Sequence, residues 1–345
     1  MRRGERSDAE TIPSPSPGSR ATGVAAHDPE RAPVVPRVRI VPMQIGSTPL
    51  VKLEKVTPGN GVEIWVKWEG ANPTGSMKDR MALSMVQGAM ARGELAPGGR
   101  LIEWTGGSTG SSLAMVCAKL GVRAHFVSSD AFSEEKLQTM RAFGATLEVL
   151  PCEGGKITAG LMQRMDARVR ELHREAGTFW TSQFTNPDNP GGYRAMADEI
   201  VDATGGRIDE FVMMVGTAGC FSGNAARLKA RVPGVRCVAG EPAESRVLSG
   251  LAPTGGHRIE GTGPGFVPAN FQADLADAVL PVTDADAMAT ARRLAREEGI
   301  WGGTSSGANV WMALQRATSL PPGSRVVTVV CDSGLKYLRG ELYRD

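Results

Sequence analysis

The sequence predicts an α/β protein in which parallel-type sheets are flanked by helices. Short apolar runs alternate with amphipathic stretches from about residue 40 onward, and this alternation is typical of βαβ units. Glycine-rich loops follow several of the apolar runs, as they do at the ligand-binding ends of parallel strands. A chain of 345 residues is also too long for one small core, so we expect two domains.

The expected strands and helices alternate along the chain. Residues 63–68 alternate apolar and polar side chains, whereas 211–215 and 326–330 are continuous apolar runs, typical of buried strands. The expected strands are 63–68, 101–104, 124–127, 146–150, 211–215, 236–240 and 326–330. The amphipathic stretches predict helices at 81–92, 111–120, 134–143, 161–175, 224–231, 285–298 and 308–317.

The composition argues against several classes of partner. Lys and Arg total 39 and Asp and Glu total 37, so a net charge of +2 gives no reason to expect nucleic acid or an anionic membrane. The five cysteines form no CxxC pair and their number is odd, which favours a reducing compartment, and we expect a cytoplasmic protein. The four histidines show no metal-ligand spacing, so no metal site is expected. No apolar run is long enough to span a bilayer.

The first 39 residues differ from the rest of the chain. They are rich in Pro, Ser, Arg and Ala and have no apolar periodicity, which predicts a disordered tail. Arg2 and Arg3 resemble the start of a twin-arginine signal, but no apolar segment follows them. We therefore do not expect an export signal.

One lysine, Lys78, lies where a turn-forming run meets a predicted helix, in the segment 72–80. Backbone N–H groups at a helix start are unpaired and the local potential is positive, which disfavours an ammonium group. A Schiff-base lysine needs such a setting. An ordinary helix start with a charged first turn would explain Asp79 and Arg80 equally well, so other segments must decide.

Two glycine-rich loops, 105–110 and 216–223, each join an expected strand to an expected helix. This geometry can hold an anion with backbone N–H groups, although glycine-rich turns are also common connectors. Neither loop matches a P-loop or a dinucleotide-binding pattern. Together with Lys78 they indicate a phosphate-bearing cofactor and a carboxylate-bearing substrate. Two further segments follow this pattern of small and polar residues. Residues 301–308 precede an expected helix and could simply cap it, and residues 331–334 could simply form a turn.

Eight segments, taken in order, resemble the cysteine synthase and cystathionine β-synthase family of pyridoxal-phosphate enzymes. This resemblance implies the two-domain tryptophan synthase β-like fold (fold type II) and covers about residues 45–337. The segments are GSTPL at 46–50, NPTGSMKDR at 72–80, TGGSTG at 105–110, QFTNP at 183–187, GTAGC at 216–220, EGTGPGF at 260–266, TSSGA at 304–308 and DSG at 332–334.

The resemblance implies a role for each segment. Lys78 would be the catalytic residue: it would form the imine with pyridoxal 5′-phosphate and later remove the substrate's Cα proton as general base. Ser305 would hydrogen-bond the pyridine nitrogen, and Ser108 would face the phenolic oxygen. The loop 216–220 would hold the phosphate, and 105–110 the substrate carboxylate. The cofactor-binding residues would thus be Lys78, Ser108, Gly216, Thr217, Ala218, Gly219, Cys220 and Ser305, and the substrate-binding residues Thr105, Gly106, Gly107, Thr109 and Gln183.

Three positions depart from the family pattern. Gly106 replaces a serine that helps to bind the carboxylate, Ser108 replaces an asparagine, and Cys220 replaces a threonine of the phosphate loop. Backbone N–H groups survive all three changes, so we expect cofactor binding to be retained. We expect these three changes to alter the choice of substrate and the rate of reaction instead.

The resemblance implies a cysteine synthase-like β-replacement enzyme, a transferase or lyase of amino-acid biosynthesis. It would convert an O-activated serine through an aminoacrylate to cysteine or a related β-substituted alanine, with a thiol, sulfide or amine as second substrate. A homodimer is implied in the same way. One alternative is a β-elimination enzyme, a dehydratase or desulfhydrase. Another is a non-catalytic cofactor-binding protein, suggested by Gly106 and Ser108.

The resemblance also divides the chain. Residues 72–186 would form a smaller, mobile N-terminal α/β domain. Residues 40–71 and 187–345 would form a larger α/β domain that carries the phosphate loop.

Overall fold

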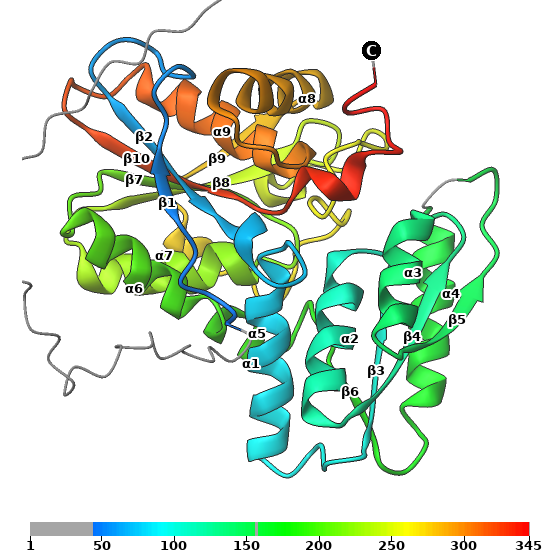
Figure 1. Cartoon of the computed structure of the whole chain (residues 1–345). Helices are drawn as coiled ribbons and strands as arrows, with labels where there is room; N and C mark the ends of the chain where they lie inside the picture. Colours follow the sequence, from blue (N-terminus) through cyan, green and yellow to red (C-terminus); the bar gives the residue numbers. More distant parts are fainter. Residues whose placement is uncertain (1–43, 156–157, 345) are drawn as a thin grey trace, which may run out of the picture. The chain divides into compact units, whose positions relative to one another are not determined.

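The computed structural model describes residues 44–155 and 158–344, which belong to one compact unit. The predicted disordered tail, 1–39, lies outside the described residues. In the described part, strands and helices alternate as predicted, and two sheets are flanked by helices (Figure 1). The predicted α/β class is therefore confirmed.

The larger sheet has six strands in the order β1-β2-β10-β7-β8-β9. All neighbouring strands are parallel except β1 and β2, which are antiparallel. The strands are β1 (Leu50–Lys52), β2 (Glu63–Trp68), β7 (Glu210–Met214), β8 (Arg236–Pro242), β9 (Ala278–Val282) and β10 (Arg325–Val330).

The smaller sheet has four parallel strands in the order β5-β4-β3-β6. They are β3 (Arg100–Trp104), β4 (Arg123–Ser129), β5 (Thr146–Leu150) and β6 (Thr178–Trp180). The helices of the protein are α1 (Lys78–Ala91), α2 (Ser108–Leu120), α3 (Glu134–Ala142), α4 (Ala159–Leu172), α5 (Asp188–Gly191), α6 (Arg194–Thr204), α7 (Gly219–Arg231), α8 (Asp284–Arg293) and α9 (Thr304–Ala317).

Helices cover both faces of the larger sheet, with α8 and α9 on one side and α6 and α7 on the other (Figure 1). The strand residues alternate between the two resulting cores, as the period of two requires. In β7, Phe211 and Met213 belong to the core that contains α6 and α7, whereas Val212 and Met214 belong to the core that contains α8 and α9.

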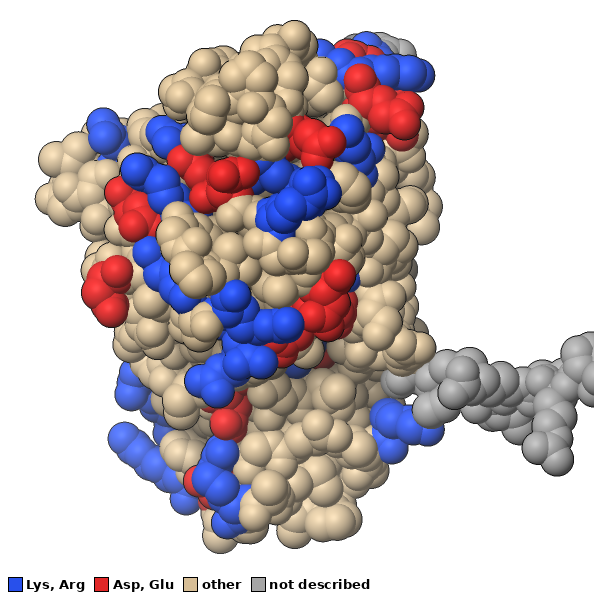
Figure 2. Space-filling view, turned by 90° about the vertical axis from the view of Figure 1, so that its left-hand side faces the viewer, with Lys and Arg blue, Asp and Glu red and all other residues tan. Residues whose placement is uncertain are grey.

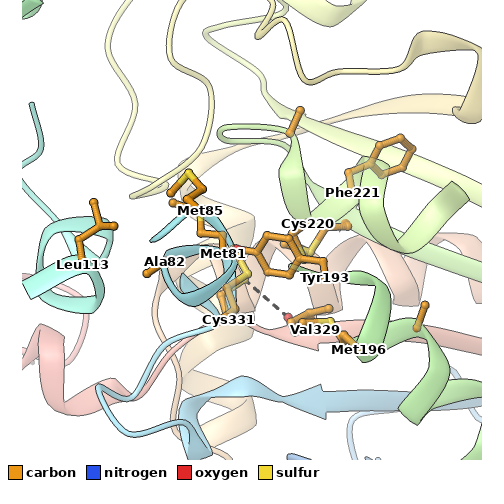
Figure 3. Close-up of a cluster of buried hydrophobic side chains, with 14 of the residues drawn as sticks. Met81, Ala82, Met85, Leu113, Tyr193, Met196, Cys220, Phe221, Val329 and Cys331 are labelled. Atoms are coloured by element: carbon orange, nitrogen blue, oxygen red, sulfur yellow. Dashed lines mark hydrogen bonds between the residues drawn. The ribbon is translucent and has the colours of Figure 1, made fainter. Parts of the chain in front are cut away.

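Helix α1 is anchored by a buried cluster of sulfur-containing and aromatic side chains (Figure 3). Met81 and Met85 of α1 are fully buried and lie with Tyr193, Cys220 and Cys331. Leu113 of α2, a helix of the smaller sheet, belongs to the same core as this cluster. Helix α1 therefore packs against elements of both sheets. The position of the first turn of α1 is therefore set by the core.

Several helices begin earlier than the sequence predicted, among them α1, which begins at Lys78 rather than 81. Helix α2 begins at Ser108 rather than 111, α7 at Gly219 rather than 224, and α9 at Thr304 rather than 308. Glycine and serine favour loops, but here packing extends the helices through them. Strands β1, β6 and β9 and helices α5 and α6 were not predicted, and the end of the predicted helix 285–298 is a π-turn, Leu294–Glu298.

Basic and acidic side chains are interspersed on the face shown in Figure 2. Several surface pairs, exposed or half-buried, are in contact, such as Arg227 with Asp198 at 2.8 Å and Arg168 with Glu148 at 2.7 Å. Across 44–155 and 158–344, no helix is both long enough and apolar enough to cross a bilayer.

Candidate active site

A cavity of about 840 Å³ opens where β3, β7 and β10 end. Ligands of parallel sheets bind at this edge, because the loops after neighbouring strands converge there. Ala218 and Cys220 line a second, much smaller cavity of about 10 Å³, and Gly219 is the first residue of α7. The main cavity is lined by the other residues predicted from the sequence: Lys78, Thr105, Gly106, Gly107, Ser108, Thr109, Gln183, Gly216, Thr217 and Ser305.

Lys78 is the first residue of α1, and its backbone N–H donates to Ser76 Oγ at 3.2 Å. The loop before it is held against the end of β10. Met77 N donates to Cys331 O at 2.8 Å, and Ser76 pairs with Asp332 in an antiparallel bridge. Lys78 therefore lines the cavity from a loop that is tied to the larger sheet.

A buried charge network holds the first turn of α1. Arg80 donates to Glu69 through Nε and Nη2, at 2.7 and 2.8 Å, and to Glu199 through Nη1 and Nη2, both at 2.8 Å. Lys67 contacts Glu199 at 2.7 Å. Burial raises the pKa of Glu199, but hydrogen bonds from Arg80 and Lys67 outweigh it and bring the pKa to about 2. Glu199 is therefore ionised at neutral pH.

The loop after β7 forms a cradle for an anion. Ala218 has a left-handed backbone, with φ of 66°, and α7 begins directly after it. In the described residues no side chain caps α7, so its first N–H groups lack partners and carry the positive end of the helix dipole. A Cβ at Gly216 would lie 2.0 Å from Gly261 O, so only glycine fits at this position. A phosphate group fits this donor set.

The loop after β3 has the same form. Thr105 Oγ1 accepts from Gly110 N at 3.1 Å, whereas the N-cap residue, Gly107, provides no side-chain cap for Ser108 and Thr109 in the part of the chain that is described. Thr109 Oγ1 donates to Gln183 Oε1 at 2.9 Å. The N-terminus of α2 and the loop 216–217 before α7 thus both line one cavity, and each helix start can bind an anionic group.

Phe132 explains the glycine at position 106. A Cβ on Gly106 would lie 2.0 Å from carbon atoms of the Phe132 ring, which also lines the cavity. A serine side chain would occupy the space that this ring fills. The departure from the family pattern at Gly106 therefore goes together with an aromatic side chain in the next loop.

We expect Gly106→Ser to destabilise the protein by about 1–3 kcal/mol, the usual cost of overpacking. The check is urea unfolding of the variant alone and in a Phe132→Ala background, where most of the cost should disappear. Gly107→Ser is the matched control, because a Cβ at Gly107 meets nothing within 4 Å. An equal cost with and without Phe132 would contradict the steric explanation.

Sequence reasoning missed Glu103, a fully buried carboxylate behind the loop 105–110. Its Oε1 accepts from Trp104 N at 2.9 Å and Trp180 Nε1 at 3.2 Å, and its Oε2 accepts from Thr181 Oγ1 at 2.7 Å and Gln183 N at 3.0 Å. Burial raises the pKa of Glu103 to about 7 despite these four donors. Glu103 therefore connects the end of β3 to Gln183.

The raised pKa of Glu103 predicts a pH-dependent stability. Between its ordinary pKa of 4.5 and its folded pKa of about 7, the folded protein binds more protons than the unfolded chain. The contribution of Glu103 to the free energy of unfolding therefore falls as pH rises through this window, by about 3 kcal/mol. Urea unfolding at pH 5 and pH 8 should show that Glu103→Gln costs more at pH 5 than at pH 8. Parallel pH profiles of wild type and variant would rule this out.

Of two adjacent serines at the start of α9, only Ser305 lines the cavity. Ser306 Oγ instead accepts from Cys331 N at 2.9 Å and is fully buried. Beside Ser305 the cavity is lined by Asp332, whose Oδ2 accepts from Tyr337 Oη at 2.7 Å. Burial raises the pKa of Asp332.

Two further features of the site, the contacts of Lys136 and of Asn189, were not predicted. Lys136 of α3 forms an ion pair with Glu260 of the loop 257–265, and both line the cavity. Asn189 of α5 hydrogen-bonds the loop after β7. Burial raises the pKa of the Cys220 thiol well above its usual value, which disfavours the thiolate form.

Known proteins are similar to this chain over most of its length. The family model described as "Pyridoxal-phosphate dependent enzyme" matches residues 41–332. The cysteine synthase of Staphylococcus aureus (strain Mu50 / ATCC 700699) is 40% identical over 301 residues, which cover 87% of this chain and 95% of the relative. Cysteine synthase B of Escherichia coli (strain K12) is 41% identical over 297 residues, which cover 85% and 92%.

A solved structure, that of O-acetyl serine sulfhydrylase isoform 3 from Entamoeba histolytica, superposes with a TM-score of 0.83 at 36% identity. The match covers 90% of this chain and 93% of that one. These matches confirm the fold expected from the sequence, the tryptophan synthase β-like fold of type II. The chain therefore belongs to the family of pyridoxal-phosphate dependent enzymes, in the group that includes the cysteine synthases.

Proposed function

We propose that this protein is a pyridoxal-phosphate dependent β-replacement enzyme of the cysteine synthase type. It acts on an O-activated serine and joins a thiol, sulfide or amine to the β-carbon. The observation that carries the proposal is that one cavity is lined by a lysine, Lys78, by the N-terminus of α2 and by the loop 216–217 that leads into α7. One anion site serves a cofactor phosphate and the other a substrate carboxylate.

Pyridoxal phosphate, when bound, supplies an aldehyde that condenses with amines and a ring that withdraws electrons from the substrate's Cα. In our proposal Lys78 Nζ holds the aldehyde carbon and, once free, accepts the Cα proton. The amides of residues 216–220 and the Thr217 hydroxyl bind the phosphate. The amides of residues 105–109, with Gln183, bind the substrate carboxylate.

Ser305 is placed in this proposal at the ring nitrogen, where its hydroxyl offers a neutral hydrogen bond. A neutral partner withdraws fewer electrons than a charged one would, which favours loss of a β-substituent over transamination. Ser108 faces the phenolic oxygen in place of the family's asparagine. Its short side chain reaches that oxygen through a water molecule.

The same proposal includes the domain division. Residues 72–186, which contain the whole smaller sheet, move as a unit and carry the carboxylate loop toward the phosphate loop 216–220 when substrate binds. The Lys136–Glu260 ion pair joins this unit to residues 187–345 beside the cavity. The enzyme works as a cytoplasmic homodimer.

The test is absorbance spectroscopy of the purified protein with O-acetylserine or O-phosphoserine, followed by mass analysis of the product after a thiol or sulfide is added. We expect a spectral change with the donor alone and a β-substituted alanine after the second addition. Pyruvate and ammonia without a second substrate would favour an elimination enzyme instead. No spectral response to any amino acid would identify a non-catalytic cofactor-binding protein.

A further inference from the structure

A buried asparagine, Asn189, connects the two anion-binding loops. Its Nδ2 donates to Gln183 O at 2.7 Å and to Thr217 Oγ1 at 3.0 Å. An amide nitrogen has two protons, and both are used here. The opposite amide orientation would place Oδ1 against the Gln183 carbonyl, which only accepts. The orientation of Asn189 is therefore fixed.

This contact orients the Thr217 hydroxyl. Because Oγ1 accepts from Asn189, its own proton remains available to another acceptor. No such acceptor lies within hydrogen-bonding distance in residues 44–155 and 158–344. Thr217 lines the cavity and stands just before the uncapped start of α7, where an anion would bind. The hydroxyl is thus left as a donor toward that anion.

Asn189 also fixes Gln183, whose carbonyl accepts a second hydrogen bond from Asn270 Nδ2 at 3.0 Å. The side chain of Gln183 accepts from Thr109, in the first turn of α2. Hydrogen bonds therefore run without a break from Thr109 through Gln183 and Asn189 to Thr217. They join the N-terminus of α2 to the loop at the N-terminus of α7.

Two observations show that Asn189 is tightly constrained. A Cβ on Gly219 would lie 1.9 Å from Asn189 Oδ1, so the side chain packs directly on the first residue of α7. That Oδ1 is buried and has no hydrogen-bond partner among the described residues. A buried acceptor without a partner is unfavourable, and such groups occur where a side chain is retained for another purpose. Here the donor side of the amide serves that purpose.

We propose that Asn189 is a positioning residue for the cofactor phosphate. It turns the Thr217 hydroxyl outward as a donor, and it ties the phosphate loop to the Gln183 segment that holds the carboxylate loop. The inference rests on the proposed function for the identity of the anion. It predicts that substitution of Asn189 weakens the binding of a ligand that carries the phosphate, and that this effect requires the Thr217 hydroxyl.

The experiment compares pyridoxal phosphate with pyridoxal, which lacks the phosphate, by absorbance titration of the full-length protein freed of cofactor. In Asn189→Asp a carboxylate oxygen replaces the donor, so Thr217 donates inward instead. We expect the dissociation constant for pyridoxal phosphate to rise about 10-fold or more, and that for pyridoxal to change less than about 2-fold. In a Thr217→Val background, Asn189→Asp should add less than about 2-fold.

Asn270→Asp is the matched control, because Asn270 donates to the same Gln183 carbonyl at 3.0 Å and its Nδ2 makes no contact with Thr217. It should leave the preference for the phosphorylated ligand intact. If Asn189→Asp does not fold, Thr217→Val alone must show the phosphate-specific loss. Equal losses for both ligands, or an equal effect of Asn270→Asp, would overturn the inference. A wild type that binds the cofactor but performs no β-replacement would refute the proposed function alone.

Discussion

Lys78→Ala is expected to abolish trapping of the cofactor by borohydride and to lower turnover by at least about 10³-fold. Trapping requires a covalent bond to a lysine amine, and Lys78 lines the cavity beside the phosphate cradle. A positioned general base contributes about 10²–10⁴-fold to the reaction rate, and this contribution is lost in the variant. The loss of covalent attachment of the cofactor lowers the rate further. Thermal unfolding should change little, since alanine is a good residue for the start of a helix.

The matched control is Lys136→Ala, which removes the other lysine that lines the cavity. Mass spectrometry after borohydride treatment should still find the cofactor attached to Lys78 in that variant. If the label persists in Lys78→Ala, or moves to Lys136 in the wild type, the assignment of the lysine is wrong. Loss of label in both variants would indicate a general disruption of the cavity.

The alternation of strands and helices could be predicted because burial leaves a direct trace in the sequence. A strand covered on both faces, such as 211–215 or 326–330, is a continuous apolar run. The helix starts could not be predicted in the same way. Gly219 and Gly223 are weak helix formers, yet Gly219 packs on Asn189, and a Cβ on Gly223 would lie 2.1 Å from Pro190 O. Close packing, which no local pattern encodes, extends α7 through them.

Helix α6 shows a signal that was present but missed. Met196 and Ile200 lie four residues apart and are both fully buried, with Ala197 and Val201 beside them on the same face. This spacing is the helical period that identified the other helices. The segment follows closely on Asn189, Pro190 and Gly191, residue types that are typical of turns.

In the candidate site, the residues that lie within short sequence motifs could be identified from the sequence. The residues that hydrogen-bond or pair with them from elsewhere in the chain could not. Lys78 and Thr217 stand within recognisable segments. Glu103 is hidden within an apolar strand, Asn189 contacts Thr217 across 28 residues, and Lys136 pairs with Glu260 across 124. Only the fold brings such residues together. Gly106 could be recognised as a departure, but its cause, the Phe132 ring, lies in another loop.

The second large effect is expected from Arg80→Met, which should lower the free energy of unfolding by about 3–5 kcal/mol. Arg80 is almost fully buried between Glu69, which is inaccessible to solvent, and Glu199. Replacing the guanidinium leaves the buried Glu69 carboxylate with hydrogen bonds from Thr48 and Asn72 but without its cation, and this desolvated charge is the source of the cost. Arg80→Lys should lie in between, because an ammonium restores the charge but cannot engage two carboxylates through paired N–H groups.

Arg92→Met is the matched control, at the C-cap of the same helix. Arg92 also contacts two acids, Glu94 at 3.0 Å and Asp188 at 2.8 Å, but its side chain is 45% exposed. A surface pair of this kind contributes at most about 1 kcal/mol, so urea unfolding should separate the two variants clearly. Because Arg80 stands two residues after Lys78, its network holds the turn from which the lysine projects. Equal costs for Arg80→Met and Arg92→Met would mean that burial of the network does not determine its strength.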